Sequence, residues 1–218
     1  MLGLYVRVPV ACFRKGLARE YLETEPLPPP ATCYGFLLSL VGEGRRRRHV
    51  GCRVAPVLLN EPERSVVLRT VWRVKGLPLG AAGNARPDFQ QLLAPVELVV
   101  WLDSSGESAG GPGLEGRVAR GLDDPASVDR FGGLSLGESS HLVDEVRLFP
   151  RPGREPPDEG RRGRAFLLAA AGRLTLPVWV DHVGAAGTRY ATGDLEGGPV
   201  TPPDPARMPR ITPEGEGD

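Results

Sequence analysis

The chain has 218 residues and a mass of 23.4 kDa, the size of one domain or two small ones. Apolar residues make up 40% of it, which is enough for one core and excludes a wholly disordered chain. Glycine (29) and proline (23) are abundant, but they fall in loops between apolar runs and show no collagen period. The composition therefore indicates an ordered, loop-rich domain.

The net charge is zero, yet the charges are unevenly distributed. Residues 1–101 hold 14 Lys and Arg against 8 Asp and Glu, whereas residues 102–218 hold 13 against 19. A molecule polarised in this way can offer one face to a polyanion and the other to a protein partner. All the cations except Lys15 and Lys75 are Arg, which suits bidentate phosphate contacts and base stacking. A GC-rich genome explains the same Arg-to-Lys ratio.

The residues 2–13 alternate between apolar and polar positions, which predicts a strand with one solvated face. Residues 32–43 have apolar residues at helical spacing, with Thr32 as the predicted N-cap and glycine at 42 and 44 as the end. The other expected elements are strands over 52–59, 66–74, 96–102 and 142–149, a loop over 75–94, a short helix around 114–122 and a hairpin over 165–180.

With the insert after the third element set aside, the order of these elements is βαββαβ, the ferredoxin-like arrangement. The sequence therefore predicts an α+β protein with a ferredoxin-like (RRM-type) domain over residues 1–150. A C-terminal β-hairpin extension is expected over 151–194, followed by an irregular tail over 195–218.

Three cysteines, Cys12, Cys33 and Cys52, are spaced too widely for a CxxC-type metal site. We expect them to be small buried residues in a reduced compartment, with no metal or cofactor. No apolar run approaches the length of a membrane span, and the N-terminal segment is interrupted by Arg7 and Pro9, so it does not resemble a signal peptide. The sequence predicts a soluble, cytoplasmic protein with no membrane partner.

Motifs of common enzyme classes are missing from the sequence: it has no GxxxxGK[ST], no GxGxxG opening a helix, no GxSxG and no HExxH. The glycines of RFGGLSLGESS (130–140) are suited either to cradling a phosphate through backbone N–H groups or to forming tight turns before the next strand. His141, close to Ser139, Ser140 and Asp144, is the one candidate for a general base. The structural alternative is a strand-edge histidine that makes a hydrogen bond.

Cations and aromatic residues alternate along the first half of the chain, as a surface that binds phosphates and stacks on RNA bases requires. The alternative is a solvated basic face with the aromatic residues in the core. The residues in question are the cations Arg14, Lys15, Arg19, Arg45–Arg48, Arg69, Arg73, Lys75 and Arg86, and the aromatics Tyr5, Phe13, Tyr34 and Trp72.

Three segments resemble the Cas-five family of CRISPR-associated proteins, which belongs to the RAMP superfamily. PLPPPATCYGFLLSLVGE (26–43) is similar to the family's N-terminal Pro-Pro-x-Thr-x-x-Gly turn into the first helix, with Pro29, Pro30, Thr32 and Gly35 at the matching positions. RPDFQQLLAPVELVVWL (86–102) resembles the return from the family's thumb, and FGGLSLGESSHLVDEV (131–146) resembles its Gly-Gly-x-x-x-Gly-Glu-Ser segment. The resemblance covers roughly residues 1–150 and is nearest to the DevS-like branch of type I systems.

The resemblance implies a β-hairpin thumb at about 64–94 and a role as a non-catalytic subunit of a Cascade surveillance complex in antiviral defence. Such a subunit binds the 5′ handle of the CRISPR RNA and caps the filament of Cas-seven-type backbone subunits beside the large subunit. The residues expected to touch RNA are Arg14, Lys15, Tyr34, Arg45, Arg46, Arg69, Arg73, Lys75, Arg86, Gly132, Gly133 and Gly137.

One branch of the family cleaves precursor CRISPR RNA with a metal-independent Tyr/Lys/His-type site. In this sequence neither Lys15 nor Lys75 has a histidine close by, which predicts no nuclease activity. Two alternatives stay open: a metal-independent endoribonuclease with His141 as its base, and a scaffold protein whose basic face is incidental.

Overall fold

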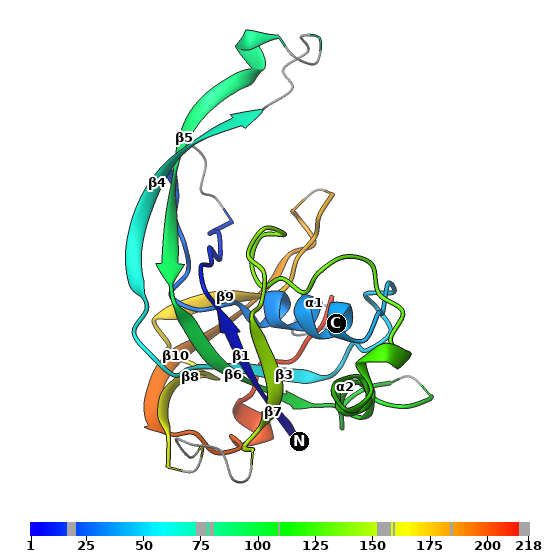
Figure 1. Cartoon of the computed structure of the whole chain (residues 1–218). Coiled ribbons are helices and arrows are strands. Elements are labelled where there is room, and N and C mark those ends of the chain that lie inside the picture. The colour runs from blue at the N-terminus through cyan, green and yellow to red at the C-terminus, as the bar shows by residue number, and fades with distance from the viewer. Residues whose placement is uncertain are drawn as a thin grey trace.

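The computed structural model describes residues 1–16, 21–72, 78, 81–108, 110–151, 158, 160–183 and 185–213. In this part of the chain, a seven-stranded antiparallel sheet forms the body, and a smaller three-stranded sheet projects from it as a long twisted hairpin (Figure 1). The strands are β1 (Leu2–Val8), β2 (Tyr21–Leu22), β3 (Arg53–Leu58), β4 (Glu63–Trp72), β5 (Ala85–Ala94), β6 (Val96–Asp103), β7 (Glu145–Phe149), β8 (Arg162–Leu168), β9 (Leu174–Trp179) and β10 (Arg189–Pro199). The helices are α1 (Pro30–Leu40) and α2 (Leu114–Asp123), with short 3-10 turns η1 (Ala82–Asn84), η2 (Pro125–Ser127) and η3 (Pro205–Arg207).

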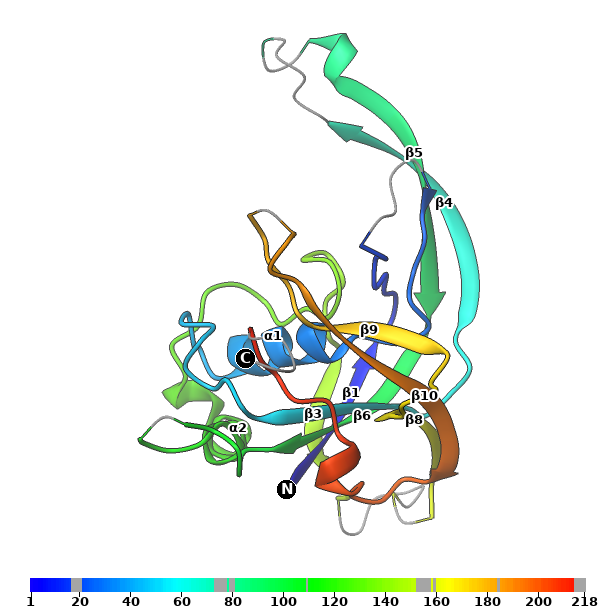
Figure 2. The same cartoon turned by 180° about the vertical axis from the view of Figure 1, so that it is seen from behind.

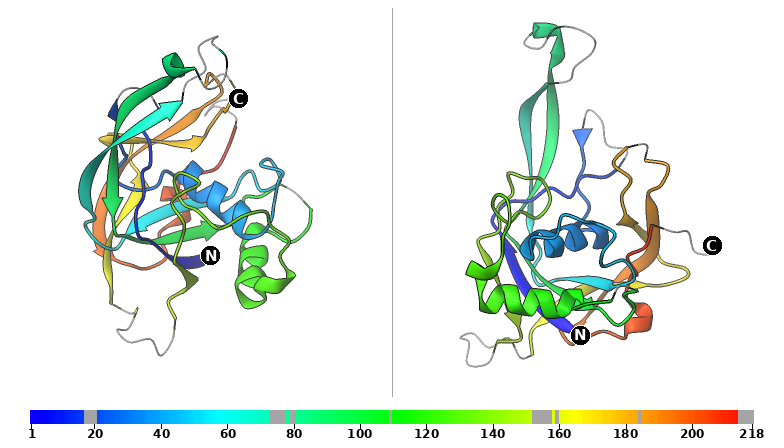
Figure 3. Two further views of the ribbon diagram at one scale, coloured as in Figure 1. Left: turned by 45° about the horizontal axis from the view of Figure 1, so that its top comes forward. Right: turned by 90° about the vertical axis from the view of Figure 1, so that its right-hand side faces the viewer.

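The body sheet has the order β7-β1-β6-β3-β8-β10-β9. The first four of these strands are connected in the chain order β1, α1, β3, β6, α2, β7, with the projecting hairpin inserted between β3 and β6. Both helices lie on the same face of the sheet (Figure 3). The remaining strands extend the sheet and curl it, so that β9 reaches the side of α1.

The main core fills the space between this face and the two helices. Alternate residues of β1 and β6, such as Leu4 and Leu98, pack there against Leu37 of α1 and Val118 of α2. The predicted solvated face of the first strand holds for Arg7 and Pro9, which are exposed, but is wrong for Tyr5, which is only 3% exposed. It belongs to a second apolar cluster on the opposite face of the sheet.

That opposite face is covered by the end of the chain. Met208 is fully buried in the second cluster, and Val200 packs against it. Residues 209–211 then run along the start of β3, where the N–H of Val54 donates to the carbonyl of Pro209 and the N–H of Ile211 to that of Cys52. Figure 2 shows this segment in red beside β3. The prediction of an irregular tail over 195–218 is therefore wrong for residues 195–199, which belong to β10. Residues 200–211 are irregular apart from η3, but they are packed on the sheet, with Met208 and Ile211 in the core.

The predicted hairpin over 165–180 is also wrong in its pairing. β8 and β9 form strands in that segment, but β10 lies between them and pairs with both. A glycine on each side makes the arrangement possible, because a Cβ on Gly172 would lie 2.4 Å from the carbonyl oxygen of Gly193.

The projecting hairpin, called the thumb below, is formed by β4 and β5, which pair from Glu63 opposite Ala94 to Trp72 opposite Ala85. It occupies the segment for which the sequence implied a thumb at about 64–94. The long loop predicted over 75–94 is wrong for residues 85–94, which form β5. Polar residues such as Gln90 and Gln91 in this strand hid its periodicity.

The helix α1 begins two residues before the predicted N-cap Thr32, with Pro30 as its first residue, where proline costs no hydrogen bond. It ends as the glycines predicted. Gly42 adopts φ +64°, and the N–H of Glu43 donates to the carbonyl of Leu38 while that of Gly42 donates to Ser39. This is a Schellman ending, in which a left-handed glycine turns the chain away from the helix.

No helix in the described part of the chain is long and apolar enough to cross a membrane.

The burial of the C-terminal segment leads to a prediction on stability. Replacing the fully buried Met208 with alanine (M208A) is expected to lower the free energy of unfolding by about 2–4 kcal/mol, because the substitution leaves a cavity between the sheet and the segment. Urea denaturation of M208A beside the exposed control R210A measures this. A loss below about 0.5 kcal/mol in M208A would mean that the segment does not pack on the sheet.

Candidate nucleic-acid interface

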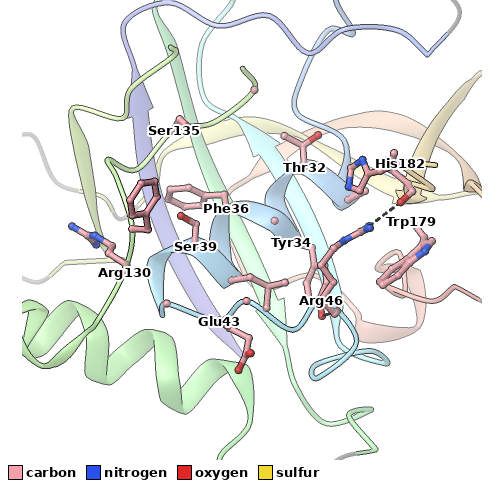
Figure 4. Close-up of a pocket in the computed structure, with 18 of the residues that line it drawn as sticks. Thr32, Tyr34, Phe36, Ser39, Glu43, Arg46, Arg130, Ser135, Trp179 and His182 are labelled. Atoms are coloured by element: carbon pink, nitrogen blue, oxygen red, sulfur yellow. Dashed lines mark hydrogen bonds between the residues drawn. The ribbon is translucent and has the colours of Figure 1, made fainter. Parts of the chain in front are cut away.

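A hollow with a volume of about 750 Å³ lies along α1. We call it the α1 groove. Its floor is α1 itself, and its walls are the segment 129–137 and the end of β9 with the residues that follow. Figure 4 shows Arg130 and Ser135 on one side of α1 and Arg46, Trp179 and His182 on the other. The groove therefore joins the two segments, 45–48 and 131–137, that the sequence singled out separately.

A second hollow of about 660 Å³ continues from the first around Trp179. We call it the arginine hollow, because Arg45, Arg46 and Arg47 line it in succession. The two hollows share Gly44, Arg46, Trp179 and Val180.

Two arginines of this hollow lie over an indole ring. The guanidinium of Arg46 lies 4.4 Å from the ring centroid of Trp179 and donates to the carbonyl oxygen of Val180 at 2.8 Å. That of Arg47 lies 5.8 Å from the same centroid. Cation–π contacts of this kind hold the arginines without neutralising them. Arg45 and Arg47 are exposed, and neither side chain forms an ion pair with another described residue. They are available to phosphates.

The loop over residues 43–49, called the arginine loop below, is joined at both ends of its arginine run to α2 by a buried polar network. Glu43 accepts hydrogen bonds from Arg117 at 2.6 Å and from Arg48 at 2.9 Å. Arg117 also contacts His49 Nε2 at 2.8 Å, and His49 Nδ1 contacts Glu107 at 2.6 Å. Glu107 in turn accepts from the N–H of the first residue of α2. The position of residues 43–49 is therefore determined by these buried contacts with α2 and the residues before it.

The charge balance within this network shifts the pKa of Glu43. Burial alone would raise it, but hydrogen bonds from Arg117 and from the backbone N–H of Arg45 outweigh burial and lower the pKa to about 2. Glu43 is therefore ionised and fully engaged, and it does not repel a polyanion in the groove.

Residues 130–140, called the glycine segment below, lie against the chain that follows β1, at Cys12. Gly137 has φ +103°, and a Cβ there would lie 2.8 Å from the carbonyl oxygen of Cys12. His141 is 9% exposed, and its Nδ1 accepts from the N–H of Cys12 at 3.2 Å and from that of Glu138 at 3.1 Å. Burial lowers the pKa of His141, which favours the neutral ring that accepts these bonds. The histidine thus holds the glycine segment in place.

The same segment touches the middle of the thumb ladder. Glu138 accepts from Arg69 of β4 at 3.0 Å and from Gln90 of β5 at 2.8 Å, and Arg69 also donates to Gln90. A continuous surface therefore runs from the arginine hollow through the α1 groove to the thumb.

The structure divides the predicted RNA-binding residues into three sets. Arg46, Gly137 and Tyr34 line the α1 groove, and Arg45 lines the hollow beside it. A second set, Arg14, Lys15, Arg69 and Arg86, belongs to the thumb and the chain next to its base, where Lys15, Arg69 and Arg86 pair with Glu23, Glu138 and Asp88. Arg19, Arg73 and Lys75 lie outside the described residues.

The prediction that Tyr34 stacks on RNA is not supported by its environment. Its side chain is only 3% exposed, and its hydroxyl donates to the carbonyl oxygen of Arg46 at 2.7 Å. The residue is part of the core and positions the arginine loop. Gly132 and Gly133 are exposed and do not line the groove, but they follow Arg130 and Phe131, which do.

Among the residues of the site that the sequence did not predict as contacts with RNA are Arg130, Phe131, Trp179 and His182. Trp179 ends an apolar strand and is indistinguishable from a core residue by pattern. Arg130 and Phe131 directly precede two glycines, and this cation–aromatic pair beside a turn is a sequence pattern that could have indicated a binding site. The described residues contain no cluster of His, Cys, Asp and Glu suited to a metal ion.

The lowered pKa of Glu43 predicts a pH dependence of stability. Because folding lowers this pKa from 4.5 to about 2, the ionised carboxylate stabilises the fold above pH 4.5, and the contribution is lost as the pH falls toward 2. We expect E43Q to be destabilised by roughly 2 kcal/mol at pH 7 and to lose less melting temperature than the unmodified protein between pH 4.5 and 3. Thermal unfolding at each pH, with the exposed E61Q as control, checks this. Parallel pH curves for E43Q and the unmodified protein would contradict it.

No protein-family model matches the sequence. The chain is 56% identical over 213 residues, 97% of each protein, to "CRISPR-associated protein Cas5" of Myxococcus xanthus (strain DK1622). Among solved structures, it is similar to one titled "CRISPR RNA-guided surveillance complex" (TM-score 0.56, 15% identity, 90% of this chain and 89% of that one). A second is titled "Crystal structure of Cas protein" (TM-score 0.51, 16% identity, 98% and 99%). The two structures show a shared fold, mixed α/β with a curled antiparallel sheet. The sequence identity shows more: the chain belongs to the CRISPR-associated Cas5 family.

Proposed function

We propose that this chain is a non-catalytic, RNA-binding subunit of a type I CRISPR surveillance complex of the DevS-like branch, and that the α1 groove and the arginine hollow hold the 5′ handle of the CRISPR RNA. The observation that carries the proposal is the succession of Arg45, Arg46 and Arg47 in the hollow beside Trp179, across the α1 groove from the wall that contains Gly137. Cations without ion-pair partners beside backbone that a ligand can approach closely are what a phosphate backbone needs.

The topology of the body supports the same location. We assign the strands β7-β1-β6-β3 with α1 and α2 to a ferredoxin-like, RRM-type unit, because their chain order and antiparallel pairing match it. RRM domains bind RNA on the open face of the sheet. Here that face is covered by Met208 and Val200. The helix side, where the groove lies, is the surface left for RNA.

The thumb is suited to contact with protein. Val66, Leu68 and Phe89 on its two strands are 48%, 64% and 50% exposed. Exposed apolar residues gathered on one projecting hairpin mark an interaction surface. We assign this surface to the adjoining Cas-seven-type backbone subunit, and the capping of the filament, beside the large subunit, to the body that carries the thumb.

The proposal of a non-catalytic subunit is supported by the environment of His141. Its Nδ1 accepts two backbone N–H groups, so the neutral ring carries its proton on Nε2 and offers no free lone pair to a ribose hydroxyl. A metal-independent endoribonuclease with His141 as its base stays the second candidate, favoured by the position of this residue beside the glycine segment.

Removing the two exposed arginines of the hollow is expected to weaken RNA binding through lost phosphate contacts. For the double variant R45A/R47A, the slope of log K against log salt becomes shallower by about 1.4, since each contact with single-stranded nucleic acid contributes about 0.7. Fluorescence anisotropy with labelled RNA from the locus's own CRISPR repeat measures this over a salt series. R173A serves as the control, because Arg173 is 93% exposed on the distant β8–β9 turn. An unchanged slope in R45A/R47A would remove the hollow from the interface, and absence of binding by the unmodified protein at low salt would favour an incidental basic face.

Incubation with the same repeat RNA in EDTA tests the absence of catalysis. We expect full-length RNA to be retained by the unmodified protein and by H141Q alike, because His141 has a structural role. Denaturing gels read the outcome. Specific cleavage by the unmodified protein that is abolished in H141Q would establish the endoribonuclease instead.

A further inference from the structure

The middle of α1 contains a glycine that no packing contact explains. Gly35 is exposed and lines the α1 groove. No atom of the described chain lies within 4 Å of the position that a Cβ would occupy there, apart from the helix's own neighbouring residues. Glycine in a helix interior is less favourable than any residue except proline. Gly35 therefore destabilises the helix, and no internal contact of the described chain requires the missing side chain.

An aromatic side chain stands at the rim of the same groove. Phe131 is fully exposed and lines the groove together with its exposed neighbour Arg130. The chain directly before them is held against the end of α1, because a Cβ on Gly42 would lie 2.1 Å from the carbonyl oxygen of Asp129. A π-face and a cation are thus held side by side, as in proteins that bind single-stranded nucleic acid.

We propose that the α1 groove seats one unstacked nucleobase of the bound RNA. Its floor is the α1 backbone at Gly35, Phe131 supplies the stacking surface, and Arg130 contacts the neighbouring phosphate. This inference rests on the proposed function and adds a single-nucleotide subsite to it. Three hydroxyl side chains, those of Thr32, Ser39 and Ser135, also line the groove and are suited to hydrogen bonds with the edge of a base.

A side chain of a partner protein is the competing occupant. The groove's lining favours the nucleotide, because Arg46, Arg130 and His182 bring positive or protonatable groups to its two sides. Of the acidic residues that line it, Glu43 is neutralised by Arg48 and Arg117, which leaves Asp129. An apolar protein side chain would desolvate the polar lining without offering it partners. A base with its phosphate satisfies both the aromatic and the polar parts.

Filling the space above Gly35 tests the proposal. G35L introduces a good helix former into open space, so the melting temperature is expected to stay level or rise by about 2–4 °C. Its affinity for the repeat RNA is expected to fall at least about fivefold, the lower end of what one stacked base contributes. The matched control is G116L, because Gly116 of α2 is likewise exposed and helical with open space at its Cβ, but lies outside the groove. F131A is expected to lose a similar factor in affinity.

Each outcome bears on the subsite. Equal RNA affinities for G35L and G116L, with normal binding by the unmodified protein, would overturn the subsite and leave the proposed function standing. Failure of the unmodified protein to bind RNA would overturn both. If G35L keeps its RNA affinity but no longer co-purifies with the co-expressed backbone and large subunits, the groove holds a protein side chain and the subsite is overturned. A marked fall in the melting temperature of G35L alone would show an internal role for Gly35, with the same consequence.

Photocross-linking identifies the seated base directly. In repeat RNAs that carry 4-thiouridine at a single position, one position is expected to cross-link to the peptide containing Phe131 far more strongly than the others. Uniform cross-linking along the RNA, or none to that peptide, would contradict the single-base seat.

Discussion

The close contact between the end of α1 and residue Asp129 is the constraint on which the site depends. Gly42 leaves no room for a side chain there, and its left-handed conformation ends the helix. On one side of this contact the chain turns so that Glu43 enters the network with Arg117, which fixes the arginine loop. On the other side the chain continues into Arg130 and Phe131. The arginine loop and the beginning of the 129–137 wall therefore both adjoin this one glycine.

The covering of the sheet by the C-terminal segment explains why the interface lies on the helix side. Tyr5, Trp101 and Phe149 form an aromatic cluster on the face that an RRM domain would offer to RNA, but Met208 is packed among them. The chain has thus used its aromatic sheet face for stability. The arginines and the exposed aromatic that remain for a ligand are found around α1, at the end of β9 and on the segment before β7.

The sequence predicted those features that depend on local patterns. Gly42 and Gly44 marked the end of α1, and the apolar run over 96–102 marked β6. The sequence did not predict long-range strand pairing. β10 inserts between β8 and β9, although Gly193, Gly197 and Gly198 interrupt any apolar alternation in it. Met208 and Ile211 stand singly among prolines, so nothing local indicates their burial. Trp179 and Tyr34 both have the sequence pattern of core residues. Only the fold shows that Trp179 contacts the Arg46 guanidinium, whereas the buried Tyr34 hydrogen-bonds to the backbone of Arg46.

Hydrogen exchange of the full chain with and without its CRISPR repeat RNA tests most directly that RNA occupies the groove. The account predicts slower exchange in two segments, residues 42–48 and 130–137, because these form the arginine loop and the glycine wall. The far edge of the sheet at β7 and Leu148 is expected to exchange at the same rate in both states. RNA-dependent protection confined to that edge or to the thumb, with the two segments unchanged, would contradict the account.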